Sequence, residues 1–276
     1  MTHDKLLKTM DCGTFSITIF CEEKMPFTNV GNQKIYYSEF GARGLPVVFV
    51  HGAAGSHLVW GMQVRALGEV ARAVALDLPG HGRSDPPGRT TIDGYRDMIL
   101  GLLDGLKFDR AVIVGHSMGG AIAQTLALSH PDRVAGLGLV GTGARLRVLD
   151  AILDGVLNDF DATAELVVDN SYAAGLDPTM RERALTEFRA CPAQITHGDF
   201  VACNSFDILP RVGDICVPTV VICGKQDRMT PSKYSEFLAS KIANARLALI
   251  DDAGHSVMIE QAEAVNRTLK EFVSNL

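Results

Sequence analysis

The chain has 276 residues, of which 47% are hydrophobic and 21% charged, and its formal net charge is −6. This ordinary globular composition excludes a disordered or collagen-like chain. The negative balance predicts neither a nucleic-acid nor an anionic-membrane partner, and no apolar run reaches the ~18 residues that a membrane span requires. The N-terminus lacks a long apolar stretch followed by small residues, so no secretory signal is expected.

The cysteines form no recognisable ligand set or disulfide framework. None of the six belongs to a Cys-x-x-Cys pair, and no His/Cys cluster has zinc spacing. In a chain of this length they are expected to be reduced and mostly buried, with a Cys12–Cys21 disulfide as the alternative. A reducing compartment, and hence the cytoplasm, is therefore predicted.

The first predicted elements form a hairpin. Residues 1–26 are interpreted as an N-terminal extension, in which Ser16–Phe20 is either an added edge strand or a partner contact. Phe27–Val30 and Lys34–Glu39 then flank a Gly-Asn dipeptide, which is typical of a tight turn. This pattern predicts an antiparallel hairpin at the edge of a sheet.

Short, β-branched apolar runs then alternate with helix-period stretches. Continuous apolar runs of four or five residues predict strands that are buried on both faces, as in a parallel sheet. The alternation predicts an α/β fold with a mostly parallel central sheet flanked by helices. The predicted strands are Pro46–Val50, Val74–Leu76, Ala111–Val114, Leu137–Val140, Thr219–Cys223 and Leu247–Ile250, and the predicted helices are Thr91–Leu106, Met118–Ser129 and Ser232–Ile242.

One stretch interrupts this alternation. Residues 144–210 contain no convincing buried strand, whereas Leu149–Phe160 and Met180–Ala190 carry apolar stripes with helical spacing. We expect a helical cap here, inserted after the sixth strand and lying over the end of the sheet. The flanking segments, 27–143 and 211–276, then make up the α/β core.

The sequence Gly115-His116-Ser117-Met118-Gly119 lies between a predicted strand and a predicted helix. In such a Gly-x-Ser-x-Gly turn the serine has strained backbone angles and an exposed hydroxyl. The chain passes so close to its neighbours that the positions two before and two after the serine must be small. Ser117 is therefore predicted to be a nucleophile, and the Met118 N–H, at a helix N-terminus, an oxyanion donor.

A serine nucleophile needs a base, and the base needs an orienting acid. Asp227 follows the strand Thr219–Cys223, and His255 follows the strand Leu247–Ile250. Both are therefore expected at the same edge of the sheet as Ser117, where open α/β sheets bind ligands. The chain order serine, aspartate, histidine is the one expected after such a turn.

Other residues compete for these two roles. Asp251 and Asp252 lie on the same loop as the histidine and are interpreted as turn residues. His81 and His116 are the rival bases. His81 lies in a glycine-rich turn, and His116 adjoins the serine, where neighbouring side chains on a tight turn point apart. The loop after the sixth predicted strand contains no acidic residue.

The second oxyanion donor is expected on the loop His51–Gly55, directly after the strand Pro46–Val50. Small residues there allow the backbone to approach the nucleophile. The Ala53 N–H is the first choice for this donor and the Ala54 N–H the alternative. His51 is interpreted as a structural residue that holds the loop.

Residues that contact the substrate are predicted on this loop and at the start of the cap. Ala54, Trp60, Leu146 and Leu149 are candidates to line an acyl pocket, and Arg145 to hold a substrate carboxylate. Packing within the core or the cap, or a solvated helix start for the arginine, is the alternative in each case.

No cofactor or metal is expected. The glycines of Gly136–Gly141 have the spacing of a dinucleotide-binding motif, but they lie within an apolar run and not after it. The chain contains neither a Walker sequence nor a His-Glu-x-x-His motif.

With these residues in place, the chain resembles the α/β-hydrolase superfamily, in the branch with a helical cap. It is most similar to bacterial carboxylesterases, cofactor-free haloperoxidase-like esterases and enol-lactone hydrolases, which share Gly-His-Ser-Met-Gly-Gly. The segments that carry the resemblance are Val50–Gly52, Asp77–Asp85, Gly115–Gly120, His130–Val134, Gly224–Asp227 and Gly254-His255.

The resemblance implies a serine hydrolase that cleaves a small carboxylic ester or lactone through an acyl-enzyme, with no cofactor or metal. A carbon–carbon bond hydrolase of a dienoic diketone acid is an alternative. Those relatives usually have a Gly-x-Gly-Pro-Gly loop and often an asparagine before the serine, where this chain has Gly52–Gly55 and His116. A ligand-binding member of the fold without enzymatic activity is a further alternative.

Overall fold

The computed structural model describes residues 26–276; the proposed Ser16–Phe20 strand and Cys12–Cys21 disulfide lie outside these residues. Within them, eight strands form one sheet in the order β1-β2-β4-β3-β5-β6-β7-β8. β2 is antiparallel to both β1 and β4, and every other neighbouring pair is parallel. The hairpin and the mostly parallel sheet are thereby confirmed. The strands are β1 (Phe27–Val30), β2 (Gln33–Phe40), β3 (Pro46–Val50), β4 (Arg72–Leu76), β5 (Ala111–His116), β6 (Val134–Val140), β7 (Thr219–Gly224) and β8 (Ala245–Ile250).

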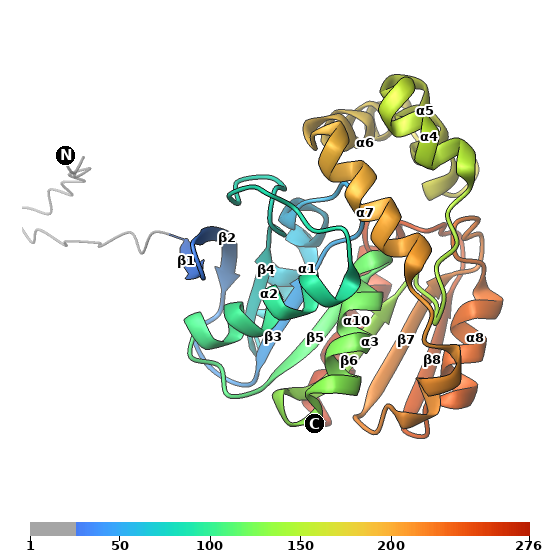
Figure 1. Cartoon of the computed structure of the whole chain (residues 1–276). Helices are drawn as coiled ribbons and strands as arrows, with labels where there is room; N and C mark the ends of the chain where they lie inside the picture. The colour runs from blue at the N-terminus through green and yellow to red at the C-terminus, as the bar shows by residue number, and fades with distance from the viewer. Residues whose placement is uncertain (1–25) are drawn as a thin grey trace, which may run out of the picture.

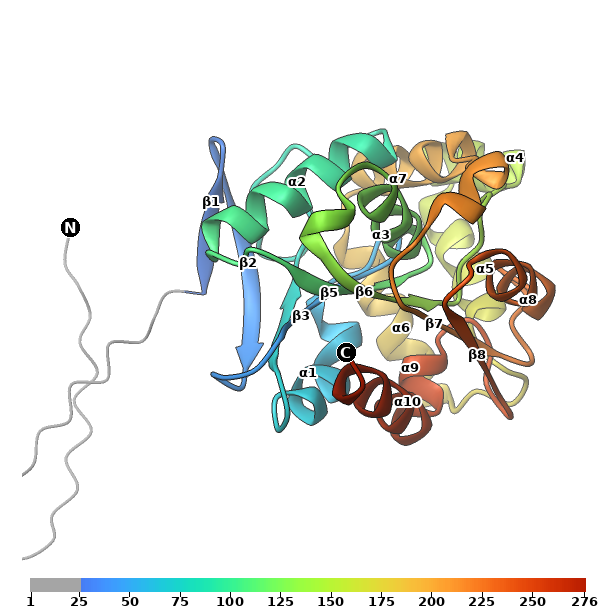
Figure 2. The same ribbon diagram turned by 90° about the horizontal axis from the view of Figure 1, so that it is seen from below.

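Helices cover both faces of the sheet (Figure 2). One face packs against α2 (Ile92–Gly105), α3 (Met118–Ser129) and α8 (Ser232–Lys241), and the other against α1 (Gly61–Leu67) and α10 (Ala262–Ser274). β5, β6 and β7 are consequently buried along their whole length, which is why their sequences are continuous apolar runs. The Gly136–Gly141 spacing belongs almost entirely to strand β6, as expected.

Four helices lie between β6 and β7 and sit above the sheet in Figure 1. They are α4 (Asp150–Asn158), α5 (Phe160–Ser171), α6 (Pro178–Ala190) and α7 (Ala193–Ser205). The insertion after the sixth strand is confirmed, whereas the exact limits of the cap, 144–210, stay a prediction. The stripe predicted over Leu149–Phe160 is split, because Asp159 ends α4 and its Oδ1 accepts the Ala162 N–H at 3.2 Å to begin α5.

α7 was not predicted, because it has no single apolar stripe. Thr196, Asp199, Phe200 and Cys203 are all buried, so polar and apolar side chains face the interior together. α7 packs on both α3 and the cap helix α4, which explains this burial on several sides. No helix within residues 26–276 is long and apolar enough to cross a membrane.

Candidate active site

Ser117 lies on the turn from β5 to α3 with φ 52° and ψ −115°, a strained conformation for a residue with a side chain. The close approach that the sequence predicts is present. A Cβ at Gly115 would lie 2.1 Å from the Gly119 carbonyl oxygen, and one at Gly119 would lie 2.3 Å from the Val50 carbonyl oxygen. The turn is further held by the Thr142 hydroxyl, which donates to the Ser117 carbonyl at 2.8 Å.

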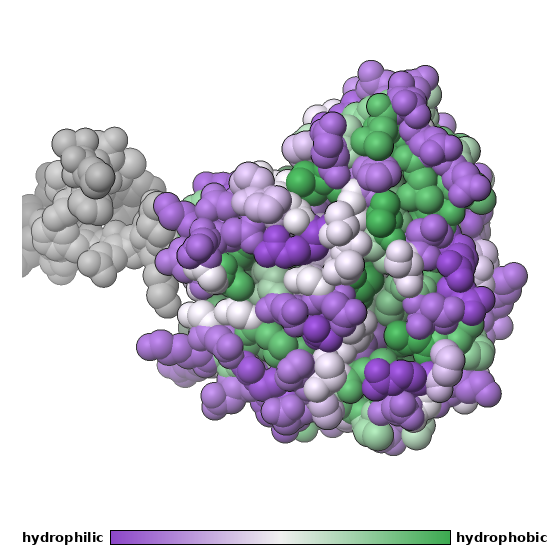
Figure 3. Space-filling model, viewed as in Figure 1, coloured by the Kyte–Doolittle hydropathy of each residue, from purple (hydrophilic) through white to green (hydrophobic). Residues whose placement is uncertain are grey.

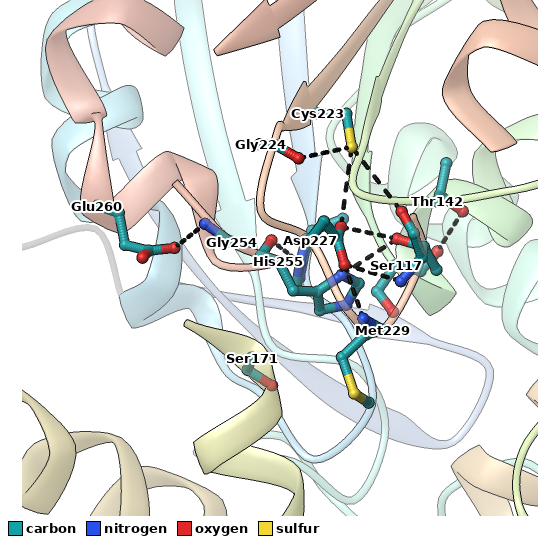
Figure 4. A network of polar contacts seen from close by, with 12 residues as sticks. Ser117, Thr142, Ser171, Cys223, Gly224, Asp227, Met229, Gly254, His255 and Glu260 are labelled. Carbon is teal, nitrogen blue, oxygen red and sulfur yellow. Dashed lines mark hydrogen bonds and ion pairs between the residues drawn. The ribbon is translucent and has the colours of Figure 1, made fainter. Parts of the chain in front are cut away.

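His255 and Asp227 form a buried pair on the loops after β8 and β7 (Figure 4). His255 Nδ1 lies 2.9 Å from Asp227 Oδ2. The N–H groups of Met229 and Thr230 donate to Asp227 Oδ1 at 2.9 and 2.7 Å. Burial opposes ionisation of Asp227, but His255 and the hydrogen bonds from Thr230 outweigh it and lower the pKa of the carboxyl. Asp227 is therefore an anion that fixes the ring of His255.

The rival residues have other roles. Asp251 pairs with Lys225 at 2.7 Å, and Asp252 is an exposed turn residue with φ 52°. His116 Nε2 lies 3.0 Å from the His255 carbonyl oxygen and donates to it. Burial and the neighbouring His255 lower the pKa of His116 to about 3, so this ring is neutral and holds the backbone of the candidate base.

The loop after β3 brings the first-choice donor, the Ala53 N–H, to the same cavity as the serine. Within residues 26–276, neither the Ala53 N–H nor the Met118 N–H donates a hydrogen bond. The Ala54 N–H, in contrast, donates to Asp199 Oδ2 at 2.9 Å, so the alternative donor is already engaged. His51 is structural, as interpreted from the sequence: it is buried, and its Nε2 accepts the Leu78 N–H at 3.0 Å.

Ser117, His255 and Ala53 line a cavity of about 710 Å³ between the sheet and the cap. This volume is within the usual range for a small-molecule site. Leu58 and Met62 line it as well and are both more than half exposed, so the cavity opens to solvent beside them. The remaining wall is mainly apolar and comes from the core and the cap, and its cap members include Val167, Val168, Tyr172, Phe188 and Phe200.

Four of the five predicted substrate contacts do not line this cavity, and Ala54 alone does. Trp60 is fully buried against Phe49 in the core, with ring centroids 5.1 Å apart. Arg145 pairs with Asp207 instead of facing a ligand. Leu146 is buried in the main core, whereas Leu149 is 69% exposed. On the surface of the cap, at the upper right of Figure 3, hydrophobic residues lie among hydrophilic ones.

The predictions for Arg145, Leu146 and Leu149 fail for a common reason at the start of the cap. The Ile208 N–H donates to the Ala144 carbonyl at 2.8 Å, and the Val148 N–H to Asn204 Oδ1 at 3.2 Å. The first residues of the cap are thus paired with its last residues and are not directed toward the serine. For Trp60 the reason differs: its indole fills the space between the sheet and α1.

Sequence patterns do not predict three charged residues that hold the loops and the cap around the cavity, because each contacts a segment distant in the chain. Asp199 of α7 binds the loop after β3. Glu260 accepts the N–H groups of Ala173 and Gly254 at 2.7 and 2.8 Å, and thereby joins the cap to the His255 loop. Arg228 donates to backbone carbonyls at the end of α5. No local sequence signal distinguishes these side chains from ordinary surface charges.

The chain belongs to the α/β hydrolase fold family, which it matches over residues 46–262. It is 29% identical to the 2-hydroxy-6-oxononadienedioate/2-hydroxy-6-oxononatrienedioate hydrolase of Cupriavidus pinatubonensis, over 88% of this chain and 91% of that protein. It also resembles the enol-lactonase of Burkholderia xenovorans LB400 at 28% identity and a TM-score of 0.86, covering 90% of this chain and 100% of the other. A thermophilic esterase is 34% identical, with a TM-score of 0.81 and coverage of 90% and 96%.

Within residues 26–276, no group of three His, Cys, Asp or Glu side chains is arranged to hold a metal ion.

Proposed function

We propose that the protein is a serine hydrolase that cleaves a small carboxylic ester or lactone through an acyl-enzyme. The observation that carries this proposal is the buried His255–Asp227 pair, 2.9 Å apart, whose histidine lines the same cavity as the strained Ser117. The names of the esterase and enol-lactonase relatives support it. A small-molecule substrate is proposed as the partner, without nucleic acid or membrane.

In this mechanism Ser117 Oγ attacks the substrate carbonyl while His255 Nε2 accepts its proton. Asp227 keeps the other ring nitrogen protonated and stabilises the imidazolium that forms. The N–H groups of Ala53 and Met118 stabilise the tetrahedral oxyanion. His255 then protonates the leaving alkoxide, and water activated by the same ring releases the acid from Ser117.

The cavity wall favours a substrate whose ends are neutral. Within residues 26–276, the charged side chains of the wall other than histidine come only from α6, namely Glu182, Arg183 and Glu187, all of them exposed. Their formal sum is −1, and the deeper wall is apolar. A dianionic dienoic acid would find one cationic partner there, Arg183, beside two carboxylates, so we place the carbon–carbon hydrolase second. The carbon–carbon hydrolase stays the second candidate because the name of the Cupriavidus relative gives a substrate of that kind.

The test is hydrolysis of p-nitrophenyl esters from acetate to laurate by the wild-type protein, by Ser117→Ala and by Ser129→Ala. Ser129 lies at the far end of the same helix, so it is a matched control. We expect a rate that is lost in the first variant and unchanged in the second. A rate that survives Ser117→Ala contradicts the proposed nucleophile. If no ester is cleaved, ring-fission products are assayed next, and a ligand-induced rise in Tm without product indicates a binding protein.

We also propose a cytoplasmic location. The four cysteines at positions 191, 203, 216 and 223 are free thiols, which suits a reducing compartment.

A further inference from the structure

Asp199 of the cap helix α7 is fully buried and lies among polar groups. Its Oδ2 accepts the Ala54 N–H at 2.9 Å and contacts His81 Nε2 at 2.8 Å. Its Oδ1 accepts the Tyr95 hydroxyl at 2.5 Å. A carboxylate without exposure is costly unless it is fully paired, and here every contact is a donor. The proposed mechanism assigns no role to this cluster.

The charge of His81 follows from its two neighbours. Its Nδ1 lies 3.1 Å from the Pro79 carbonyl oxygen, and its Nε2 lies 2.8 Å from the Asp199 carboxylate. Both are acceptors, so both ring nitrogens must carry a proton. The other histidine in contact, His51, is 4.9 Å away between ring centroids and is held neutral by burial, which lowers its pKa to about 4. Asp199 and His81 therefore form a buried ion pair.

The pair bears on catalysis through Ala54. This residue has φ 54°, the left-handed region that costs a side-chain-bearing residue free energy, and its N–H is held by Asp199. The preceding residue, Ala53, carries an N–H that donates no hydrogen bond within residues 26–276 and lines the same cavity as the serine. The Ala54 N–H belongs to the peptide unit that joins the two residues, so holding it restrains backbone rotation at Ala53 and with it the direction of the Ala53 N–H.

We propose that Asp199, supported by His81, is a positioning residue: it holds the loop after β3 from the cap side, so that the Ala53 N–H faces the developing oxyanion. The inference rests on the proposed serine hydrolase function. It also gives the cap a second task, because α7 would then help to build the oxyanion site as well as to wall the cavity. Asp199 and Ala54 are 145 residues apart in the chain.

The test compares Asp199→Ala, Asp199→Asn and Asp207→Asn on p-nitrophenyl acetate, with fold and Tm checked for each. An oxyanion donor acts on the transition state and not on the bound ester, so kcat should fall while KM changes less than about threefold. Loss of one such donor lowers kcat by about 10²–10³. We expect Asp199→Ala to approach that loss. Asp199→Asn should be partly rescued, because its amide oxygen can still accept the Ala54 N–H.

Asp207→Asn is the matched control, since that aspartate also belongs to the cap insertion but pairs with Arg145 away from the cavity. Equal losses at positions 199 and 207, or an Asp199→Ala kcat within threefold of wild type, would overturn the inference and leave the hydrolase proposal standing. If Asp199→Ala fails to fold, the asparagine variant decides the same comparison.

Hydrogen exchange of residues 51–56 gives a readout that does not need activity. The Ala54 amide should exchange faster in Asp199→Asn than in wild type, and faster still in Asp199→Ala. Unchanged exchange would refute the positioning role even if the wild-type protein hydrolyses no ester. Absence of any Ser117-dependent turnover, with faster exchange in the variants, would instead refute the hydrolase function alone.

Discussion

Asp227→Asn is the perturbation whose consequence follows most directly from the geometry. The side-chain oxygens of Asp227 have different surroundings. Oδ1 accepts two backbone N–H groups, from Met229 and Thr230, at 2.9 and 2.7 Å. Oδ2 faces the Thr230 hydroxyl and His255 Nδ1, both at 2.9 Å. An amide nitrogen in place of Oδ1 would face two backbone N–H donors that cannot reorient. The side-chain oxygen of the asparagine must therefore take the place of Oδ1.

The amide nitrogen of the substituted side chain would then face His255 and donate to Nδ1. The ring would carry its proton on Nε2, the nitrogen that has to accept the proton from Ser117. Other triads lose about 10⁴-fold in kcat from this tautomer change. We expect a loss of about 10³–10⁴-fold, which corresponds to about 4–5.5 kcal/mol of transition-state stabilisation at 1.36 kcal/mol per tenfold.

The assay is kcat/KM for p-nitrophenyl acetate, with circular dichroism and Tm to establish that the variant is folded. Asp252→Asn serves as the control, because this exposed residue has φ 52°, a conformation that asparagine tolerates. It should keep wild-type activity. A folded Asp227→Asn variant with more than about a tenth of wild-type activity, or a larger loss in the control, would refute the assignment of the acid.

Three further outcomes are expected. Gly119→Ala should lower Tm markedly or prevent folding, because the added Cβ would lie 2.3 Å from a backbone oxygen of β3. Gly61→Ala is the control and should not lower Tm, because no atom lies within 4 Å of its Cβ. Equal Tm values for the two variants would contradict the close-packed turn. Burial lowers the pKa of the His81 imidazole, but the Asp199 carboxylate outweighs it and raises this pKa well above the ordinary value. The stability that His81 contributes is therefore complete below pH 6.5 and is lost as the pH rises through the raised pKa. Urea unfolding between pH 6 and 9 should show the advantage of wild type over His81→Gln shrinking, by at most about 1.4 kcal/mol per pH unit; a growing advantage would refute the ion pair. Leu149→Ser, at an exposed position, should leave kcat/KM for each ester within twofold of wild type. Phe200→Ala, in the cavity wall, should change the acyl-length preference. The reverse pattern would indicate that Leu149 contacts the substrate.

Sequence patterns predict the features that depend on residues close together in the chain. Buried strands between helices require continuous apolar runs, and a serine turn that approaches other backbone this closely requires glycine on both sides. Because parallel strands end at one edge of the sheet, positions just after β5, β7 and β8 had to lie near one another. The candidate residues Ser117, Asp227 and His255 were therefore within reach of sequence reasoning.

The way in which the cap meets this edge follows from tertiary packing. Periodicity shows that a helix has an apolar face but not which element covers it, so Leu149 was expected in the pocket and is exposed, while α7 was not predicted at all. The contact of Asp199 with the Ala54 N–H joins segments 145 residues apart, and a buried aspartate has no signature that distinguishes it from a solvated one. The cavity wall and the support of the oxyanion loop therefore depend on packing between distant segments.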